Sequence, residues 1–145
     1  MNLSDQGKLL IKTSEGLRLM PYSDCVGKST IGYGHLIGPT EDFASGITLA
    51  QAEQLFDWDV ERAEGIVSRE CKVPLTQGGF DALTDFCFNL GDRLQGSTLL
   101  RYLNAGNYAE AEAQLPNWCY AAGRPNPALR ARRLLELKEW QGEAA

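Results

Sequence analysis

The chain has 145 residues and a formal net charge of −5, and 43% of its residues are hydrophobic, an ordinary share for a globular protein. This length favours one domain, and the negative charge excludes the overall basic field of a nucleic-acid-binding protein. The first fourteen residues carry only the short apolar run Leu9–Ile11 between lysines. That run is far below the roughly 18 apolar residues of a membrane span, so we expect no signal peptide and no stable membrane association.

A first helix is predicted over residues 4–14, with Asn2 or Ser4 as its N-cap. Gly16 suits a C-terminal cap, which places Glu15 at the C-terminal end of this helix. Residues 17–38 then lose helical periodicity, and strand-forming residues lie on both sides of a turn at Gly27. This segment predicts two or three short antiparallel strands.

Helical signals return at Thr48, where the sequence Thr48–Gln51 has the form of a capping box. Apolar residues recur at helical spacing between Ala52 and Val67, which predicts a long amphipathic helix over residues 49–69. We expect Trp118 and Tyr120 on a turn. Further helices are predicted from Thr76 to Gly91, at Thr98–Ala105, from Asn107 to Pro116, and from Asn126-Pro127 to near Gln141, with a frayed end at Gly142–Ala145.

Together these elements predict an α+β fold that is mainly α, with residues 1–145 forming a single domain. We expect a small antiparallel sheet lobe over about residues 16–48 and a larger helical lobe over about residues 49–141. A cleft between two such lobes is the natural place for a ligand.

Two acids near this cleft differ in their predicted surroundings. The negative end of the helix dipole would raise the pKa of Glu15, as a general acid requires. Asp24 lies in a polar turn whose amides and hydroxyls would keep it ionised, and the hydroxyl of Thr30 could hold a water. Two carboxyl groups with pKa values pushed apart are the arrangement that hydrolyses glycosidic bonds, although two such acids alone are more often ordinary surface residues.

The longer string from Glu15 to His35, E-G-L-R-L-x-P-Y-x-D-x-x-G-x-x-T-I-G-Y-G-H, resembles the bacteriophage lysozyme family, glycoside hydrolase family 24. The resemblance extends over about residues 8–140 and implies a lysozyme-like fold. Its weaker parts are Phe80–Leu83, Phe88–Gly91, Ser97–Leu100, Leu103–Gly106, Trp118, and Leu129–Arg133 with Glu136.

The resemblance implies a phage endolysin that hydrolyses the β-1,4 bond between N-acetylmuramic acid and N-acetylglucosamine in peptidoglycan. It makes Glu15 the general acid, Asp24 the second carboxylate and Thr30 the residue that positions water. It also places four residues along the sugar cleft, two of which, the apolar Leu36 and Phe88, could equally belong to the core. Those four are Leu36, Phe88, Asn89 and Thr98. No cofactor and no metal are expected.

Two other functions are compatible with parts of the same sequence pattern. A lytic transglycosylase would act on the same bond with one glutamate and would need neither Asp24 nor Thr30. A non-catalytic wall-binding protein would have no reason to keep all three polar residues. For an endolysin we expect a monomer that stays in the host cytoplasm until a phage holin releases it, and that then reaches the wall in the periplasm of a Gram-negative host.

The sequence also predicts structural roles for several other residues. The only histidine, His35, is expected to be structural and to pair with an acid behind the sheet. Arg130 or Arg133 could pair with Glu15 or Asp5, although a solvent-facing basic helix is as good an interpretation. Gly32 and Gly34 indicate close backbone approach, to the substrate or between strands.

The four cysteines have wide spacings that fit no zinc motif, and we expect free thiols in a reducing cytoplasm. They are Cys25, Cys71, Cys87 and Cys119. We expect Cys25 to be structural or incidental and Cys87 to pack as an apolar residue.

Overall fold

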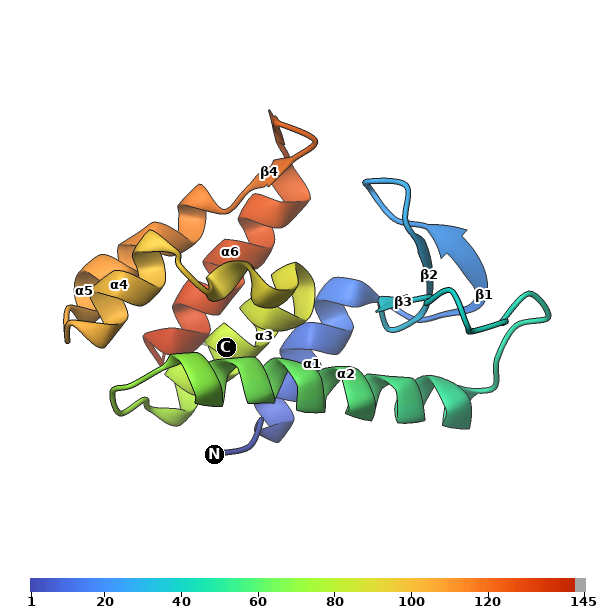
Figure 1. Ribbon diagram of the computed structural model, residues 1–145, viewed down its shortest axis with the longest axis horizontal. Coiled ribbons are helices and arrows are strands. Elements are labelled where there is room, and N and C mark those ends of the chain that lie inside the picture. Colours follow the sequence, from blue (N-terminus) through green and yellow to red (C-terminus); the bar gives the residue numbers. More distant parts are fainter. Residues whose placement is uncertain (143–145) are drawn as a thin grey trace.

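The computed structural model describes residues 1–142, and within them a small sheet and a larger group of helices lie side by side (Figure 1). Helix α2 runs along the base of both parts, and α1 lies between them. This confirms the predicted α+β fold that is mainly α. The elements are α1 (Asp5–Glu15), β1 (Arg18–Ser23), β2 (Ser29–Gly32), β3 (His35–Leu36), α2 (Leu49–Glu70), α3 (Gln77–Leu90), the 3-10 helix η1 (Gly91–Leu94), α4 (Thr98–Asn104), α5 (Tyr108–Gln114), η2 (Leu115–Asn117), β4 (Tyr120–Ala121), β5 (Arg124–Pro125) and α6 (Pro127–Trp140).

The predicted helix caps are confirmed by backbone hydrogen bonds. Ser4 rather than Asn2 caps α1, and its hydroxyl accepts from the amide of Gly7. Thr48 and Gln51 form a complete capping box at the start of α2. None of the helices within residues 1–142 is long and apolar enough to cross a membrane. Of the predicted frayed end, Gly142 lies in a turn, and residues 143–145 lie outside the described part of the chain.

The first sheet is antiparallel with the order β1-β2-β3, as predicted, and β1 carries an irregularity between Arg18 and Tyr22. A second sheet, the hairpin β4–β5, was not predicted. Its two turn residues, Ala122 and Gly123, have φ angles of 51° and 76°. Both values are those of a two-residue type I′ turn, which usually begins with asparagine, aspartate or glycine rather than alanine.

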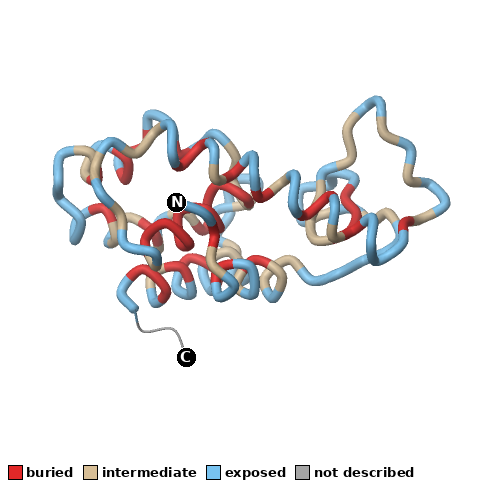
Figure 2. The backbone as a smooth tube through the Cα atoms, turned by 90° about the horizontal axis from the view of Figure 1, so that it is seen from below, coloured by how far each residue is buried: buried red, intermediate tan, exposed pale blue. Residues whose placement is uncertain are grey.

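Two groups of buried apolar side chains hold the fold together, and Figure 2 shows buried residues in both parts of the molecule. The larger group fills the space among the helices. The smaller group lies under the sheet and consists of Ile31, Ile47, Ala52 and Leu55. Helix α2 contributes Leu55 to the smaller group and the next residue, Phe56, to the larger one. It therefore fixes the sheet relative to the helices.

Helix α6 turns charged side chains rather than leucines towards the other helices. Leu134 is 38% exposed and Leu135 is 43% exposed. The face that packs against the other helices instead carries charged side chains, together with Trp140: Arg132, Arg133, Glu136 and Glu139. The buried face of α6 is therefore mostly polar rather than made of leucines.

His35 is structural, as predicted, and it binds two acids from different elements. Its Nδ1 lies 2.8 Å from Asp59 Oδ2 on α2, and its Nε2 lies 3.0 Å from Glu41 Oε1 in the loop after β3. The hydrogen bond to Asp59 is the largest cause that raises the pKa of His35, to about 9. The imidazolium form therefore joins the sheet, its following loop and α2.

The raised pKa predicts how stability changes with pH. The stabilisation from charged His35 should be fully present below its unfolded pKa of about 6.5 and lost as the pH rises through about 9. We expect the free energy of unfolding to fall by about 2–3 kcal/mol across this window, relative to a His35→Gln variant. Urea unfolding of both proteins from pH 6 to pH 10 measures this difference, and parallel pH curves for the two proteins would contradict it.

Candidate active site

A cleft of about 640 Å³ lies between the sheet and the helices. Its lining comes from the end of α1, the β1–β2 loop, β3, α2, the end of α3, η1, the β4–β5 hairpin and α6. Five of the seven residues predicted for the site line this cleft. Those that line it are Glu15, Asp24, Leu36, Phe88 and Asn89.

Glu15 is the last residue of α1, and its side chain is 16% exposed. Gly16 follows with φ 72°, a left-handed conformation that turns the chain out of the helix. Gly34 packs directly against the Glu15 carboxyl group, so that a Cβ at Gly34 would collide with it. The predicted close approach at Gly34 is confirmed, but its neighbour is the side chain of Glu15 rather than substrate or another strand. Gly32 packs against Ala52 of α2.

Arg132 of α6 is the charge partner of Glu15, and its Nη1 donates to Glu15 Oε2 at 2.6 Å. The same guanidinium makes a bidentate pair with Asp85 of α3, at 3.0 and 2.9 Å. Burial raises the pKa of Glu15, and Arg132 opposes this rise without cancelling it. The predicted rise in the pKa of Glu15 is thus present, and its largest cause is the loss of solvent on burial.

The expectation that Arg130 or Arg133 pairs with Glu15 or Asp5 is wrong. Arg130 is exposed, and Arg133 is fully buried and donates to Glu136 Oε1 at 2.7 Å and to Asn89 Oδ1 at 2.9 Å. On α6, only one of these neighbouring arginines has the helical phase to reach α1, and it is Arg132. The basic helix is therefore only partly a solvated face, because Arg132 and Arg133, two of the four basic side chains of α6, are buried.

Burial and the nearby Asp85 carboxylate raise the pKa of Glu136 well above its usual value. Burial would also raise the pKa of Asp85, but the guanidinium of Arg132 outweighs it and the pKa is lowered. Asp85 is therefore the charged member of this pair and Glu136 the neutral one. Both side chains are 0% exposed.

Asp24 lies in the β1–β2 loop, and backbone amides fix its carboxylate. Its Oδ1 accepts hydrogen bonds from the amides of Val26 at 3.0 Å and Lys28 at 2.8 Å. The amide of Asp24 itself donates to the carbonyl of Lys28, which closes the loop. The predicted polar turn therefore exists, and its donors are backbone amides.

Thr30 follows this loop on β2 and is 2% exposed. Its hydroxyl donates to the carbonyl of Lys28 at 2.9 Å, and the residue is not part of the cleft lining.

Of the predicted sugar-binding residues, Leu36 is 50% exposed at the cleft, whereas Phe88 lines the cleft and also belongs to the main core. Thr98 is exposed at the start of α4, where Arg101 donates to its hydroxyl, and it does not line the cleft.

Several cleft residues were not predicted. They include an aspartate on α2 that already binds His35, a tyrosine of the unpredicted hairpin, and three basic side chains. No sequence motif marked them, because they come from four separate elements that only the fold brings together. They are Asp59, Tyr120, Lys28, Arg62 and Arg93.

Cys25 is exposed at the cleft beside Asp24, and Cys87 is buried in the helical core as predicted. All four thiols are free. Within residues 1–142 no group of three or more histidine, cysteine, aspartate or glutamate side chains is placed to hold a metal ion.

The chain is similar in sequence to proteins of one known family. A sequence model described as phage lysozyme matches residues 12–136. The chain belongs to the phage lysozyme family. An endolysin of Acyrthosiphon pisum secondary endosymbiont phage 1 is 39% identical over 94% of this chain and 95% of its own length. An endolysin of Salmonella phage P22 is 38% identical over 92% and 94%.

The fold agrees with a solved structure of the same kind. An endolysin from Escherichia coli O157:H7 phage FAHEc1 superposes with a TM-score of 0.84 at 36% identity and covers 97% of this chain and 93% of its own. Membership of the phage lysozyme family makes the chain a glycoside hydrolase of the lysozyme type. The resemblance that the string from Glu15 to His35 indicated is confirmed.

In this phage lysozyme, Asp85 and Glu136 should respond differently to loss of a carboxyl group. Asp85→Asn removes the negative charge that holds buried Arg132 and should cost about 3–5 kcal/mol of stability. Glu136→Gln replaces a neutral acid with a neutral amide of the same shape, and should cost less than about 1 kcal/mol. Urea unfolding at pH 7 measures both, and equal losses in the two variants would contradict the assignment of charge.

Gly34 offers a test of how Glu15 is positioned. Gly34→Ala should lower kcat/KM about 100-fold or more, because the new methyl group displaces the Glu15 carboxyl. Gly106→Ala is the matched control, since Gly106 also has a left-handed φ, 82°, but open space where its Cβ would be. The control should lose about 1–2 kcal/mol of stability and keep its activity. Activity retained in Gly34→Ala would argue against the close packing.

Proposed function

We propose that this lysozyme hydrolyses the β-1,4 bond between N-acetylmuramic acid and N-acetylglucosamine with Glu15 as the general acid. The observation that carries the proposal is a carboxyl group of raised pKa, 16% exposed, in the wall of a cleft that also contains Asp24. A carboxyl that stays protonated towards neutral pH can donate its proton to the leaving oxygen of the glycosidic bond.

Asp24 has the position of the second carboxylate in this mechanism. The two amides that bind Oδ1 fix its orientation, so its other oxygen can face a water or the developing positive charge on the sugar. We assign Thr30 the role of positioning that water. Its hydrogen atom is used on the carbonyl of Lys28, so its oxygen would accept a hydrogen bond from the water rather than donate one.

The sugar-binding residues follow from the same cleft. Leu36 offers an exposed apolar side chain, Asn89 an amide that Arg133 orients, and Phe88 the edge of a core residue. Thr98 contributes, under this proposal, only to parts of the glycan that extend beyond the cleft. Transglycosylase and pure wall-binding activities are not favoured, because the endolysins it resembles and the family belong to the hydrolytic lysozymes.

The cell wall is the target that family membership implies. We propose that the enzyme acts as a monomer and waits in the host cytoplasm until a holin permits release to the periplasm of a Gram-negative host. Endolysins of a Salmonella phage and of a Bacillus phage are similarly related to this chain, at 38% and 40% identity, but the chain spans 94% of the former and only 51% of the latter, which supports this destination. Lysis of Gram-negative cells that express the chain without a holin would overturn the holin requirement.

Glu15→Gln should abolish hydrolysis while leaving the fold intact. The amide keeps the shape of the side chain but cannot donate the proton, so we expect kcat to fall by about 10²–10⁴-fold. Mass spectrometry of the sugar ends released from purified Gram-negative sacculi measures both the amount and the chemistry. Reducing muramic acid ends are expected from the wild type.

Glu61→Gln is the matched control, because Glu61 is exposed on α2 and lies outside the cleft lining. It should release the same ends at the wild-type rate. Anhydro-muramic ends from the wild type would instead identify a transglycosylase and remove the role given to Asp24 and Thr30.

A further inference from the structure

The three-stranded sheet turns one face towards the cleft, and three side chains form a row across that face. Thr30 of β2 lies directly opposite Tyr22 of β1 and Leu36 of β3. Directly opposed residues of antiparallel strands point to the same face of a sheet. The next residue, Ile31, points to the other face, where it is 0% exposed in the apolar group under the sheet. Because Leu36 lines the cleft, the row Tyr22–Thr30–Leu36 belongs to the cleft-facing side.

Thr30 is the most enclosed member of this row. It is 2% exposed, whereas Leu36 is 50% exposed and leaves its own side of the row open. Tyr22 stands on the opposite flank, is half-buried and does not line the cleft. An aromatic ring covers more of its neighbour's surface than most other side chains can. The ring of Tyr22 therefore shields Thr30 on the side away from the cleft.

A cation holds the ring of Tyr22 in this place. The guanidinium carbon of Arg18 lies 4.8 Å from the centre of the ring. Arg18 is opposite Gly32 and Tyr22 is opposite Thr30, so β1 takes more residues than β2 between the two pairs. An irregularity of this kind changes the direction of the side chains beside it. Here it brings Arg18 and Tyr22 of one strand together over the same face.

Tyr22 also lies within electrostatic reach of both carboxylates of the cleft. Burial raises the pKa of Tyr22, and the charges of Glu15 and Asp24 raise it as well, whereas Arg18 lowers it. The phenol therefore stays neutral at neutral pH. Its ring can exclude solvent from this part of the site without adding a charge to it.

We infer that Tyr22 is a positioning residue for the hydrolytic water, and that Arg18 holds its ring in place. The ring closes the site behind Thr30, so that a water bound by the Thr30 oxygen is open only towards the cleft. The water is thereby confined near Asp24 while the glycosidic bond breaks, and a fixed position of this kind speeds a reaction. The inference rests on the proposed function, because it needs the water that Thr30 is proposed to hold.

Steady-state hydrolysis of soluble peptidoglycan fragments tests the role of the ring. Tyr22→Leu should lower kcat about 10- to 100-fold, because the water loses its fixed position. KM should stay within about twofold, since Tyr22 lies outside the cleft that holds the sugar. Tyr22→Phe keeps the ring and should retain most of kcat. Arg18→Gln removes only the support of the ring and should lower kcat about 2- to 5-fold.

Coupling to Thr30 separates positioning from a general effect on the fold. The oxygen that holds the water is absent from a Thr30→Ala variant, so adding Tyr22→Leu to it should lower kcat hardly further. Equal losses from Tyr22→Leu in both backgrounds would overturn the inference. A loss in Tyr22→Phe as large as that in Tyr22→Leu would also overturn it, because the hydroxyl rather than the ring would then act.

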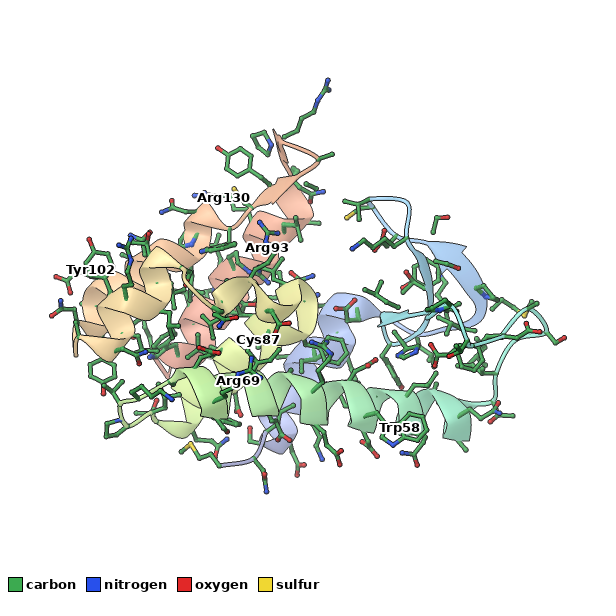
Figure 3. All side chains as sticks on the ribbon, viewed as in Figure 1. Trp58, Arg69, Cys87, Arg93, Tyr102 and Arg130 are labelled. Carbon is green, nitrogen blue, oxygen red and sulfur yellow. The ribbon has the colours of Figure 1, made fainter. Side chains whose placement is uncertain are left out.

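Two control variants remove exposed side chains that are not part of the cleft lining. Met20→Ala shortens a side chain of the same strand that is 56% exposed. Trp58→Ala removes an aromatic ring that is also 56% exposed, from α2 (Figure 3). Both should keep the kcat and KM of the wild type. A loss in Met20→Ala as large as that in Tyr22→Leu would overturn the inference, because any change in β1 would then slow the reaction.

The shielding of Thr30 can be measured without catalysis. Thr30→Cys puts a thiol in the place of the hydroxyl, and mass spectrometry can follow its alkylation by iodoacetamide separately from that of the exposed Cys25. Adding Tyr22→Leu should speed this alkylation about 10-fold or more, because access limits the reaction of a thiol, whereas adding Met20→Ala should not. If the wild type hydrolyses no peptidoglycan, the proposed function fails. An alkylation rate that Tyr22→Leu leaves unchanged would overturn the inference by itself.

Discussion

The contact on which the site depends is the guanidinium of Arg132 between two carboxylates. It joins Glu15 at the end of α1 to Asp85 in the middle of α3, and it comes from α6. A buried cation of this kind needs a charged partner, and the bidentate pair with Asp85 supplies it. Three helices that are far apart in the sequence are therefore fixed to one another at the place where the cleft begins.

This arrangement explains why the buried face of α6 is polar. Arg133 and Glu136 extend the same network to Asn89, so charged and amide groups connect the interior of the helical lobe to the cleft wall. Apolar side chains in these positions would pack as well and cost less desolvation. The network instead holds the carboxyl group of Glu15 partly buried, with the cation of Arg132 close enough to limit the rise in the pKa of Glu15.

The sheet lobe carries the other part of the site, the loop of Asp24, although it has only a small apolar core. Its apolar group is small and depends on Ala52 and Leu55 of α2, and His35 adds an ionic attachment to Asp59 on that helix. Gly34 lets the sheet approach Glu15 closely. Sheet and helices thus meet at Glu15, and the strands hold the loop of Asp24 in a fixed relation to it.

Much of this protein could be read from the sequence because the signals are local. Caps at Thr48 and Thr76, helical spacing along α2 and the string from Glu15 to His35 depend on neighbours within a few residues, and each led to the correct element or family. Contacts between distant elements carry no such signal. The choice of Arg132 over Arg130 and Arg133 depends on the helical phase of α6 against α1, and the β4–β5 hairpin has alanine where its turn type usually has asparagine, aspartate or glycine. The cleft lining likewise joins Asp59 of α2, Arg93 of η1 and Tyr120 of β4 only because packing brings these elements together. Tertiary structure alone therefore decided how the acid is held and which side chains surround it.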